Sequence, residues 1–275
     1  MFQPHKQEQC PSRVSPARTN GKGTDMSNPS PNWFDLGGRD YARYRPDYPE
    51  ELARFLAGVA PDRRLAIDAG CGNGQFTALL ARHFDAVVGL DPSADQIANA
   101  LPHDRIRYEV APAERLGCAD GSAGLITAAQ AAHWFDLPRF YAEARRVGVP
   151  GVAIALISYG VARLEPELND RFQRFYADEI GPYWPPEHRL VDSGYADIPF
   201  PFRELPAPDM EIARSWSAPD FLGYISTWSA VRRAREAGQE EMLEAFSRDM
   251  LRLWGDPARQ RTIRWPIAMR LGVME

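Results

Sequence analysis

The chain has 275 residues, with 32 Lys or Arg against 37 Asp or Glu and a formal net charge of −5. This length suits one α/β domain with an insertion. The acidic balance and scattered arginines argue against a nucleic-acid partner, which needs a clustered basic face. No segment approaches the roughly 20 apolar residues that span a bilayer, and the first residues lack an apolar signal segment, so we expect no membrane partner.

The three cysteines, Cys10, Cys71 and Cys118, are widely spaced and form no C-x-x-C pair. We therefore expect neither a disulfide framework nor a metal site, and a reducing cytoplasm as the location. Residues 1–30 are rich in Ser, Pro, Asn and Gln and hold few apolar groups. Such a segment does not bury enough surface to offset the entropy of ordering, so we expect a disordered tail, with Met26 as an alternative start.

Strands and helices alternate along the chain from residue 65 onward. The apolar run 65–67 predicts a buried strand, and Phe76, Leu79 and Leu80 predict a helix by their spacing. Further strands are expected over 87–90, 106–110, 124–128 and 152–157. Helix starts are expected at the capping box of Ser93 and Gln96 and at Asp136. Strands that alternate with helices predict a parallel sheet covered on both faces.

A glycine-rich turn follows the first expected strand. Its glycines, Gly70, Gly72 and Gly74, are spaced G-x-G-x-G, and a turn without Cβ atoms lets the backbone approach a ligand closely. The dinucleotide fingerprint G-x-G-x-x-G would need a third glycine where this chain has Gln75. Asp91 ends the second expected strand, where its carboxylate can accept hydrogen bonds from both hydroxyls of a ribose.

With Asp68 before it and Asp91 after it, this turn resembles that of the class I S-adenosylmethionine-dependent methyltransferases. The segment 41–49, YARYRPDYP, and the string QAAHWFD over 130–136 are similar to those of the small-molecule group that contains the trans-aconitate methyltransferases. The resemblance implies a Rossmann-like α/β fold: a seven-stranded methyltransferase sheet with helices on both faces and an inserted, mainly helical substrate cap. It implies S-adenosyl-L-methionine as cofactor and a small-molecule substrate, in a monomer or homodimer. One departure is Val152, where the group commonly has a second glycine after Pro150.

The resemblance also divides the chain. It implies an S-adenosylmethionine-binding core with an N-terminal lid over 31–160, a substrate cap over 161–234, and a C-terminal part of the same domain over 235–275. Within that last part, 241–254 is expected to be an amphipathic helix and 264–271 a closing antiparallel edge strand.

The same resemblance assigns the site residues. The implied cofactor contacts are Tyr41, Arg45, Asp68, Gly70, Cys71, Gly72, Asn73, Gly74, Asp91, Pro92, Ala113, Glu114, Gln130 and Ala131. The implied substrate contacts are Tyr44, Trp134 and Tyr159. Tyr41 and Tyr44 have an alternative role in packing a leading helix, and Arg45 can pair with the cofactor carboxylate or with a nearby acid. His133 is the candidate general base, with a structural hydrogen-bonding role as the alternative.

The chemistry of the acceptor decides whether a base is needed. A carboxylate is already ionised at neutral pH, whereas a phenol, an alcohol or a protonated amine must lose a proton. Arginines of the expected cap could bind a carboxylate as forks: Arg163, Arg171, Arg174, Arg189, Arg203 and Arg214. O-methylation of a small organic acid is the leading hypothesis. An O- or N-methyltransferase of a natural product, a dinucleotide oxidoreductase and a catalytically silent cofactor-binding protein stay open.

Overall fold

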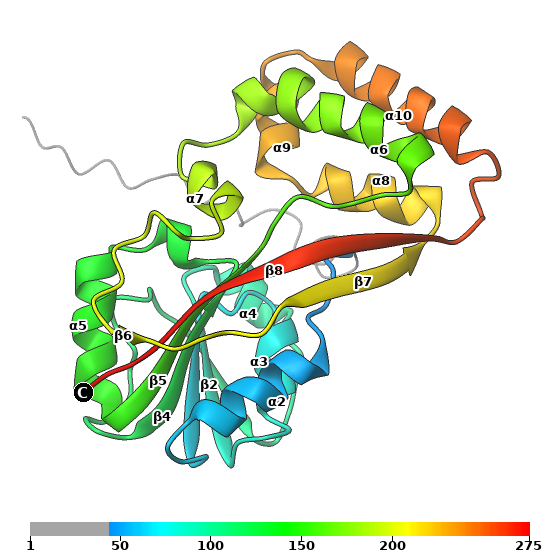
Figure 1. Ribbon diagram of the computed structural model, residues 1–275. Helices are drawn as coiled ribbons and strands as arrows, with labels where there is room; N and C mark the ends of the chain where they lie inside the picture. Colours follow the sequence, from blue (N-terminus) through cyan, green and yellow to red (C-terminus); the bar gives the residue numbers. More distant parts are fainter. Residues whose placement is uncertain (1–43) are drawn as a thin grey trace, which may run out of the picture. The chain divides into compact units, whose positions relative to one another are not determined.

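The computed structural model describes residues 44–275, and its centre is one eight-stranded sheet (Figure 1). The strand order is β3-β2-β1-β4-β5-β8-β6, and β7 also pairs with β8. The strands are β1 (Leu65–Ala69), β2 (Ala86–Asp91), β3 (Ile106–Val110), β4 (Ala123–Ala129), β5 (Gly148–Tyr159), β6 (Arg203–Glu204), β7 (Met210–Trp216) and β8 (Arg261–Val273). The expected α/β class with helices around the sheet is confirmed, and the sheet has eight strands where seven were expected.

Five strands, β1 to β5, are parallel, and their order reverses between β1 and β4. Asp68 of β1 is paired with Gly89 of β2 on one side and with Thr127 of β4 on the other. In open α/β sheets, ligands bind outside the carboxyl ends of the strands at such a reversal. The topology therefore selects the ends of β1, β2 and β4 as the place for a site.

The long strand β8 explains the additional pairing. Its C-terminal part runs antiparallel to β5, from Tyr159↔Ile267 to Ala153↔Val273. Its N-terminal part pairs with β7, and its last residues pair with β6. The expected antiparallel strand over 264–271 is therefore present, but it is not an edge, because β6 and β7 cover its outer side.

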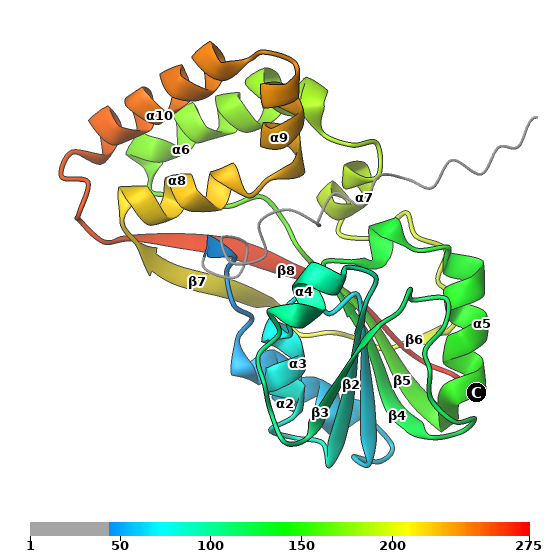
Figure 2. The ribbon, with the colours of Figure 1, turned by 180° about the vertical axis from the view of Figure 1, so that it is seen from behind.

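Helices pack on both faces of the sheet (Figure 2). They are α2 (Glu50–Val59), α3 (Gln75–Leu80), α4 (Ala94–Ala98) and α5 (Leu137–Val147), with the 3-10 turn η1 (Ala132–Trp134) before α5. Leu52 and Leu56 of α2 pack with Phe76 of α3 on one face, and Phe140 of α5 packs on the other. Both expected helix starts carry an N-cap: the Ser93 side chain accepts from Gln96 N at 3.3 Å and Asp136 accepts from Arg139 N at 3.4 Å.

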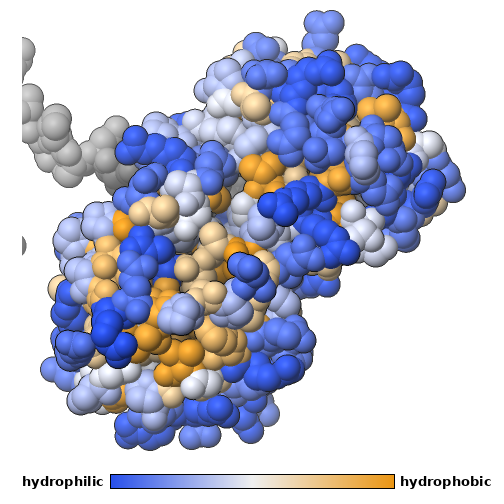
Figure 3. Space-filling view, in the orientation of Figure 1, coloured by the Kyte–Doolittle hydropathy of each residue, from blue (hydrophilic) through white to orange (hydrophobic). Residues whose placement is uncertain are grey.

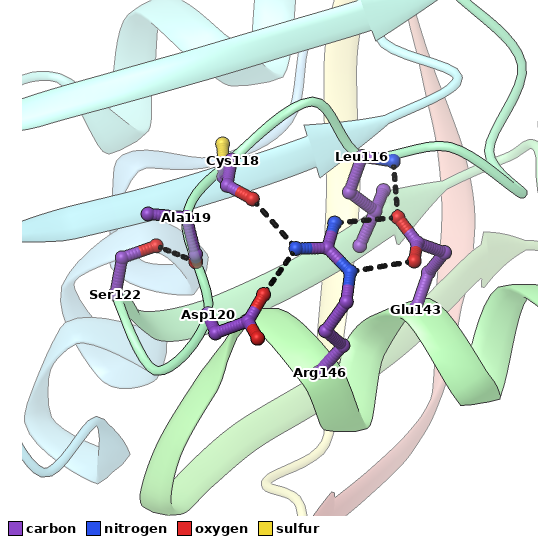
Figure 4. A network of polar contacts seen from close by, with 7 residues as sticks. All are labelled: Leu116, Cys118, Ala119, Asp120, Ser122, Glu143 and Arg146. Atoms are coloured by element: carbon purple, nitrogen blue, oxygen red, sulfur yellow. Dashed lines mark hydrogen bonds and ion pairs between the residues drawn. The ribbon is translucent and has the colours of Figure 1, made fainter.

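One arginine fastens the loop between β3 and β4 to α5 (Figure 4). The Arg146 guanidinium donates to both Glu143 carboxylate oxygens at 2.7 Å, to Asp120 Oδ1 at 2.7 Å and to the Cys118 carbonyl at 2.9 Å. Glu143 in turn accepts from Leu116 N at 3.0 Å. The guanidinium lowers the pKa of Glu143, so the carboxylate stays ionised within this network.

The remaining helices form a layer of their own. They are α6 (Pro166–Arg174), the π-helical turn η2 (Phe175–Glu179), the 3-10 turn η3 (Gly181–Tyr183), α7 (His188–Asp192), α8 (Ala218–Ser226), α9 (Ser229–Glu236) and α10 (Glu240–Trp254). Apart from α7, they share an aromatic core in which Phe175 stacks on Phe246 with ring centroids 3.7 Å apart. Helix α10 lies outside the expected cap range of 161–234 but packs in this core, while β6 and β7 lie inside that range and join the sheet.

The surface differs between these regions. On the face shown in Figure 3, hydrophobic side chains gather over the lower, sheet-bearing region, and the helical layer is mostly hydrophilic. No helix within residues 44–275 is long and apolar enough to cross a membrane. No group of three or more His, Cys, Asp or Glu in that same range is arranged to hold a metal ion. The expected tail over 1–30, and residues 31–43 of the expected lid with Tyr41, lie outside the described residues.

Candidate active site

The three glycines of the turn between β1 and α3 all have left-handed backbone angles. The φ angles are +68° at Gly70, +55° at Gly72 and +84° at Gly74, a region that other residues rarely adopt. A Cβ at Gly70 would lie 2.4 Å from Ala131 Cβ, and one at Gly74 would lie 2.1 Å from the Tyr108 hydroxyl. A Cβ at Gly72 would meet nothing nearer than Gln96 Oε1 at 3.7 Å. Gly70 and Gly74 therefore pack against the protein, and Gly72 borders open space.

Asp68 supports the turn from inside. Its side chain is fully buried, and its two oxygens accept hydrogen bonds from Thr77 Oγ1 at 2.7 Å and Thr127 Oγ1 at 2.8 Å. Burial raises the pKa of Asp68 to about 6. The Asp68 carboxylate thus joins β1 to α3 and β4. Both oxygens of this expected cofactor contact already accept hydrogen bonds from threonines of the protein.

Asp91 connects the turn to α4. Its Oδ2 accepts from Gly72 N at 2.8 Å, and its Oδ1 accepts from Ser93 N at 2.9 Å. A carboxylate has about four lone-pair positions, so it can accept from several donors at once, ribose hydroxyls among them. The position at the end of β2, expected from the sequence, is thereby confirmed.

The surroundings of the turn suit a cofactor that carries a sugar and an amino acid. Gln96 Oε1 lies on the open side of Gly72, and Tyr108 Oη lies beside Gly74. Both atoms are buried and have no hydrogen-bond partner within residues 44–275. A buried polar atom without a partner is costly, so a ligand group that supplies one is favoured. An open glycine, a strand-end carboxylate and these two atoms together fit S-adenosylmethionine.

The other implied cofactor residues lie around this turn. Cys71 N donates to the Leu90 carbonyl at 2.9 Å, and burial raises the pKa of the Cys71 thiol, which stays protonated. Asn73 is buried, Pro92 is exposed beside Asp91, and Ala131 packs on Gly70. Ala113 is buried after β3, and Glu114 Oε1 accepts from Asp136 N at 2.7 Å. Glu114 thereby ties the loop after β3 to the start of α5.

A pocket lies next to the carboxyl ends of β4 and β5, between these strands and the helical layer. Its lining residues are Arg45, Gln130, His133, Trp134, Tyr159, Gly160, Val161, Ala162, Tyr176, Trp184, Pro185, His188, Val191, Tyr224, Trp228 and Ser229. Gln130 has a left-handed φ of +56°, and its Oε1 accepts from Tyr159 N at 3.0 Å. Backbone strain of this kind in a non-glycine residue tends to occur at functional sites.

Arg45 connects the two sides of the pocket. Its Nη1 donates to the Tyr159 hydroxyl at 3.0 Å, its Nη2 donates to the Thr227 carbonyl at 3.4 Å, and its guanidinium lies 5.7 Å from the Tyr224 ring centroid. Among the lining residues of the described chain, Arg45 is the one with a permanent charge, and none is Asp or Glu. The Asp192 carboxylate does not line the pocket but lies 2.5 Å from the hydroxyl of Tyr176, which does, so Arg45 is the lining group with the charge to bind an anion.

His133 is partly buried in the pocket wall. Its Nδ1 lies 2.9 Å from the Tyr195 hydroxyl, and its ring centroid lies 4.9 Å from that of Trp134. Burial lowers the pKa of His133 to about 3, so the ring is neutral at physiological pH. A group with so low a pKa is a weak proton acceptor, which disfavours the general-base role and favours hydrogen bonding.

Some of the expected substrate residues line this pocket, and others lie elsewhere in the structure. Trp134 and Tyr159 line the pocket, whereas Tyr44 packs its ring on Gly223 of α8 and does not line it. None of the six cap arginines lines it either; Arg171, for instance, pairs with Glu179 and Asp249. His188 and Tyr195 were not expected at this site, because no local sequence pattern marks a residue that meets the strand ends only through tertiary packing.

This strand order, together with the glycine turn after β1 and the acid at the end of β2, defines a class I S-adenosylmethionine-dependent methyltransferase. The chain belongs to the methyltransferase family: the methyltransferase domain family matches residues 67–156. A protein of Dictyostelium discoideum described as a methyltransferase is 34% identical over 259 residues, which are 90% of this chain and 98% of that protein.

Two further comparisons agree. The structure of a protein from Anaeromyxobacter dehalogenans, described as a type II methyltransferase, has a TM-score of 0.78 and 45% identity, covering 84% of this chain and 98% of that one. The trans-aconitate 2-methyltransferase of Deinococcus radiodurans is 36% identical over 113 residues, which are 38% of this chain and 42% of that protein. The expected family and cofactor are confirmed, and the dinucleotide alternative is dropped.

Proposed function

We propose that this methyltransferase acts on a small organic acid and methylates a carboxylate oxygen. The observation that carries the proposal is the charge of the pocket: within the described chain its lining includes Arg45 and no carboxylate. A guanidinium is permanently charged and suited to bind a carboxylate, and a partly desolvated site strengthens the attraction. The similarity to a trans-aconitate 2-methyltransferase supports the same class of substrate.

The residues have separable tasks in this proposal. Asp91, Gly72 and Gln96 would hold S-adenosylmethionine, which supplies a methyl group on a sulfonium that is already activated for transfer. Arg45, held by Tyr159 and by the Thr227 carbonyl, would orient the acid. Positioning of two reactants can supply roughly 7 to 11 kcal/mol of the barrier.

The aromatic side chains of the helical layer would exclude water from the acid. Tyr176, Trp184 and Trp228 line the pocket from that side; Trp228 lies in the aromatic core of that layer, and the other two pack against it. Exclusion of water strengthens the electrostatic interactions inside a site. A carboxylate acceptor needs no general base, in agreement with the low pKa of His133.

The test uses the full chain, S-adenosylmethionine with a labelled methyl group, and a panel of carboxylic acids, phenols and amines. A carboxyl methyl ester releases methanol in mild alkali, whereas a methyl ether or an N-methyl group does not. We expect labelled methanol from one or more acids. Transfer confined to phenols or amines would overturn the carboxylate assignment, and cofactor binding without any transfer would favour a silent binding protein.

A matched pair of variants locates the acid in the pocket. Arg45→Met should raise the KM for the acid at least tenfold, because it removes a charge-assisted hydrogen bond. Arg189→Met removes an exposed arginine of α7 that does not line the pocket, and it should leave the KM unchanged. An unchanged KM in Arg45→Met would remove the main support for the proposal.

A further inference from the structure

Two histidines line the substrate pocket from opposite parts of the chain. His133 belongs to η1 after β4, and His188 begins α7 in the segment that covers the strand ends. Each ring has one nitrogen engaged by a tyrosine hydroxyl and one nitrogen without a hydrogen-bond partner within residues 44–275. Neither of these two nitrogens is fully buried, so both are accessible to a ligand.

The proton of His133 can be placed from its neighbours. Its Nδ1 lies 2.9 Å from the hydroxyl of Tyr195, whose side chain is fully buried, and within residues 44–275 it is the one hydrogen-bond acceptor in reach of that hydroxyl. A buried hydroxyl whose proton has no acceptor is costly, so the proton points to Nδ1. The neutral ring of His133 therefore carries its own proton on Nε2 and offers an N–H donor.

Tyr195 is held firmly enough to fix this arrangement. Its side chain is fully buried, and its backbone has a left-handed φ of +65°. Its amide donates to the Leu190 carbonyl at 2.8 Å, which closes the end of α7. A strained backbone persists where the surrounding structure determines it, so the hydroxyl has little freedom to turn away from His133.

The proton of His188 can be placed in the same way. Its Nε2 lies 2.9 Å from the Tyr176 hydroxyl, which donates its single proton to Asp192 Oδ1 at 2.5 Å. The hydroxyl must then accept from Nε2, so the ring of His188 also has its proton on Nε2 and leaves a lone pair on Nδ1. Stacking on Trp184, with centroids 3.7 Å apart and planes 5° apart, fixes the ring plane.

Both rings stay neutral at physiological pH. Burial lowers the pKa of His133 to about 3, with His188 and Arg45 as further causes. Burial also lowers the pKa of His188 to about 4, opposed by Asp192 and assisted by Arg45. The two histidines thus share one tautomer but present opposite groups: His133 a donor and His188 an acceptor.

We propose that His133 and His188 are substrate-binding residues that select a hydroxyl-bearing carboxylic acid. His133 donates a hydrogen bond from Nε2–H to the carboxylate, and His188 Nδ1 accepts one from the hydroxyl. This inference rests on the proposed function, because it takes the carboxylate as the methyl acceptor. The hydroxyl is recognised and not methylated. A site built to hydrogen-bond a substrate hydroxyl discriminates strongly against the analogue that lacks it, since a polar group of the protein is then left unpaired.

The first test needs no substrate. Nitrogen-15 NMR of the histidine rings distinguishes the Nε2–H tautomer from the Nδ1–H tautomer and from the charged ring. Between pH 6 and 8 we expect both His133 and His188 to be neutral with the proton on Nε2; His133→Gln and His188→Phe assign the signals. An Nδ1–H signal from either residue, or a charged ring, would overturn the inference.

The second test compares pairs of acids that differ by one hydroxyl group. We expect kcat/KM to be at least tenfold higher for the hydroxy acid in the wild-type protein. His188→Phe keeps a flat ring against Trp184 and removes the lone pair, so this ratio should fall close to one. His133→Phe should raise KM for both acids and preserve the ratio, and His133→Gln, which offers an amide donor, should restore much of the loss.

The outcomes separate the two proposals. If no acid is converted to an ester, the proposed function fails, whatever the ring signals show. If acids are esterified without any preference for the hydroxyl, or if His188→Phe leaves the preference intact, the proposed function stands and this inference fails.

Discussion

At the scale of single residues, the glycine turn separates packing from ligand binding. Gly74 is closed by the Tyr108 ring, whereas Gly72 faces open space beside a buried acceptor. Both have positive φ, so any other residue is strained at either position. The two glycines are thus required for different reasons, and substitution should reveal the difference.

Gly72→Ala should weaken cofactor binding by tenfold or more, because its methyl group enters the space that the cofactor would use. The backbone strain should cost about 1 to 2 kcal/mol of unfolding free energy. Gly121→Ala is the matched control: Gly121 has φ +57° against +55° at Gly72, and nothing lies within 4 Å of its added Cβ. Calorimetry should show normal cofactor affinity for the control, and equal affinities in both variants would argue against cofactor binding at Gly72.

The buried carboxyl of Asp68 should give the protein a pH-dependent stability. Burial raises its pKa from 3.8 to about 6, so the folded state binds a proton more tightly than the unfolded chain does. This contribution is complete below about pH 4 and is lost as pH rises to about 6, by about 3 kcal/mol in all. Asp68→Asn has no carboxyl to titrate at this position. From urea unfolding, we expect its free energy of unfolding to rise relative to that of the wild type between pH 4 and 7. A parallel pH dependence in both proteins would contradict the prediction.

Some site residues could be predicted from the sequence and others could not. Asp91 and the glycines lie directly after apolar runs, so local order places them at strand ends. Tyr195 contacts His133 from 62 residues away, and His188 lines the same pocket from about 55 residues away, through a segment whose path depends on packing. Tyr44 shows the opposite case, because its motif suggested a substrate contact while its ring fills the space over Gly223.

At the scale of elements, the parallel strands follow from continuous apolar runs, which only a sheet covered on both faces can bury. Strand β7 could not be predicted in this way, because its pairing with β8 joins Met210–Trp216 to residues about 50 positions later. The two-residue strand β6 carries no pattern of its own. Helix α10 has a clear amphipathic pattern, but the pattern does not say which core receives its apolar side.

The Arg146 network offers a test at this scale. Arg146→Met should lower the free energy of unfolding by about 1 kcal/mol, since the side chain is partly exposed and the ion pairs are screened. Arg139→Met, on the exposed side of the same helix α5, is the control. Hydrogen exchange should speed up at residues 116–122 in Arg146→Met alone. Unchanged exchange in that loop would show that the contacts of Figure 4 do not hold it.

At the scale of the described chain, strand β8 belongs both to the sheet and to the core of the helical layer. Leu271 packs with the strands against α2, while Ile263 and Trp265 pack with the aromatic core of the helical layer. Arg45 adds a second link, because it joins Tyr159 of β5 to the Thr227 carbonyl after α8. A continuous strand that is shared in this way should make the sheet and the helical layer unfold together.

Unfolding of the two regions can be followed separately, because Trp184, Trp216, Trp228, Trp254 and Trp265 all lie in or against the aromatic core of the helical layer. Trp134 of η1 lies outside that core, so the test uses a variant that carries Trp33→Phe and Trp134→Phe. In this variant, tryptophan fluorescence and far-ultraviolet circular dichroism should report one coincident thermal transition. S-adenosylmethionine at 100 times its Kd adds about 2.7 kcal/mol, which should raise both midpoints equally, by about 5 to 10 °C. A fluorescence transition at a lower temperature than the circular dichroism transition, with a midpoint unchanged by the cofactor, would mean that the helical layer opens independently. Substrate entry would then require no opening of the sheet.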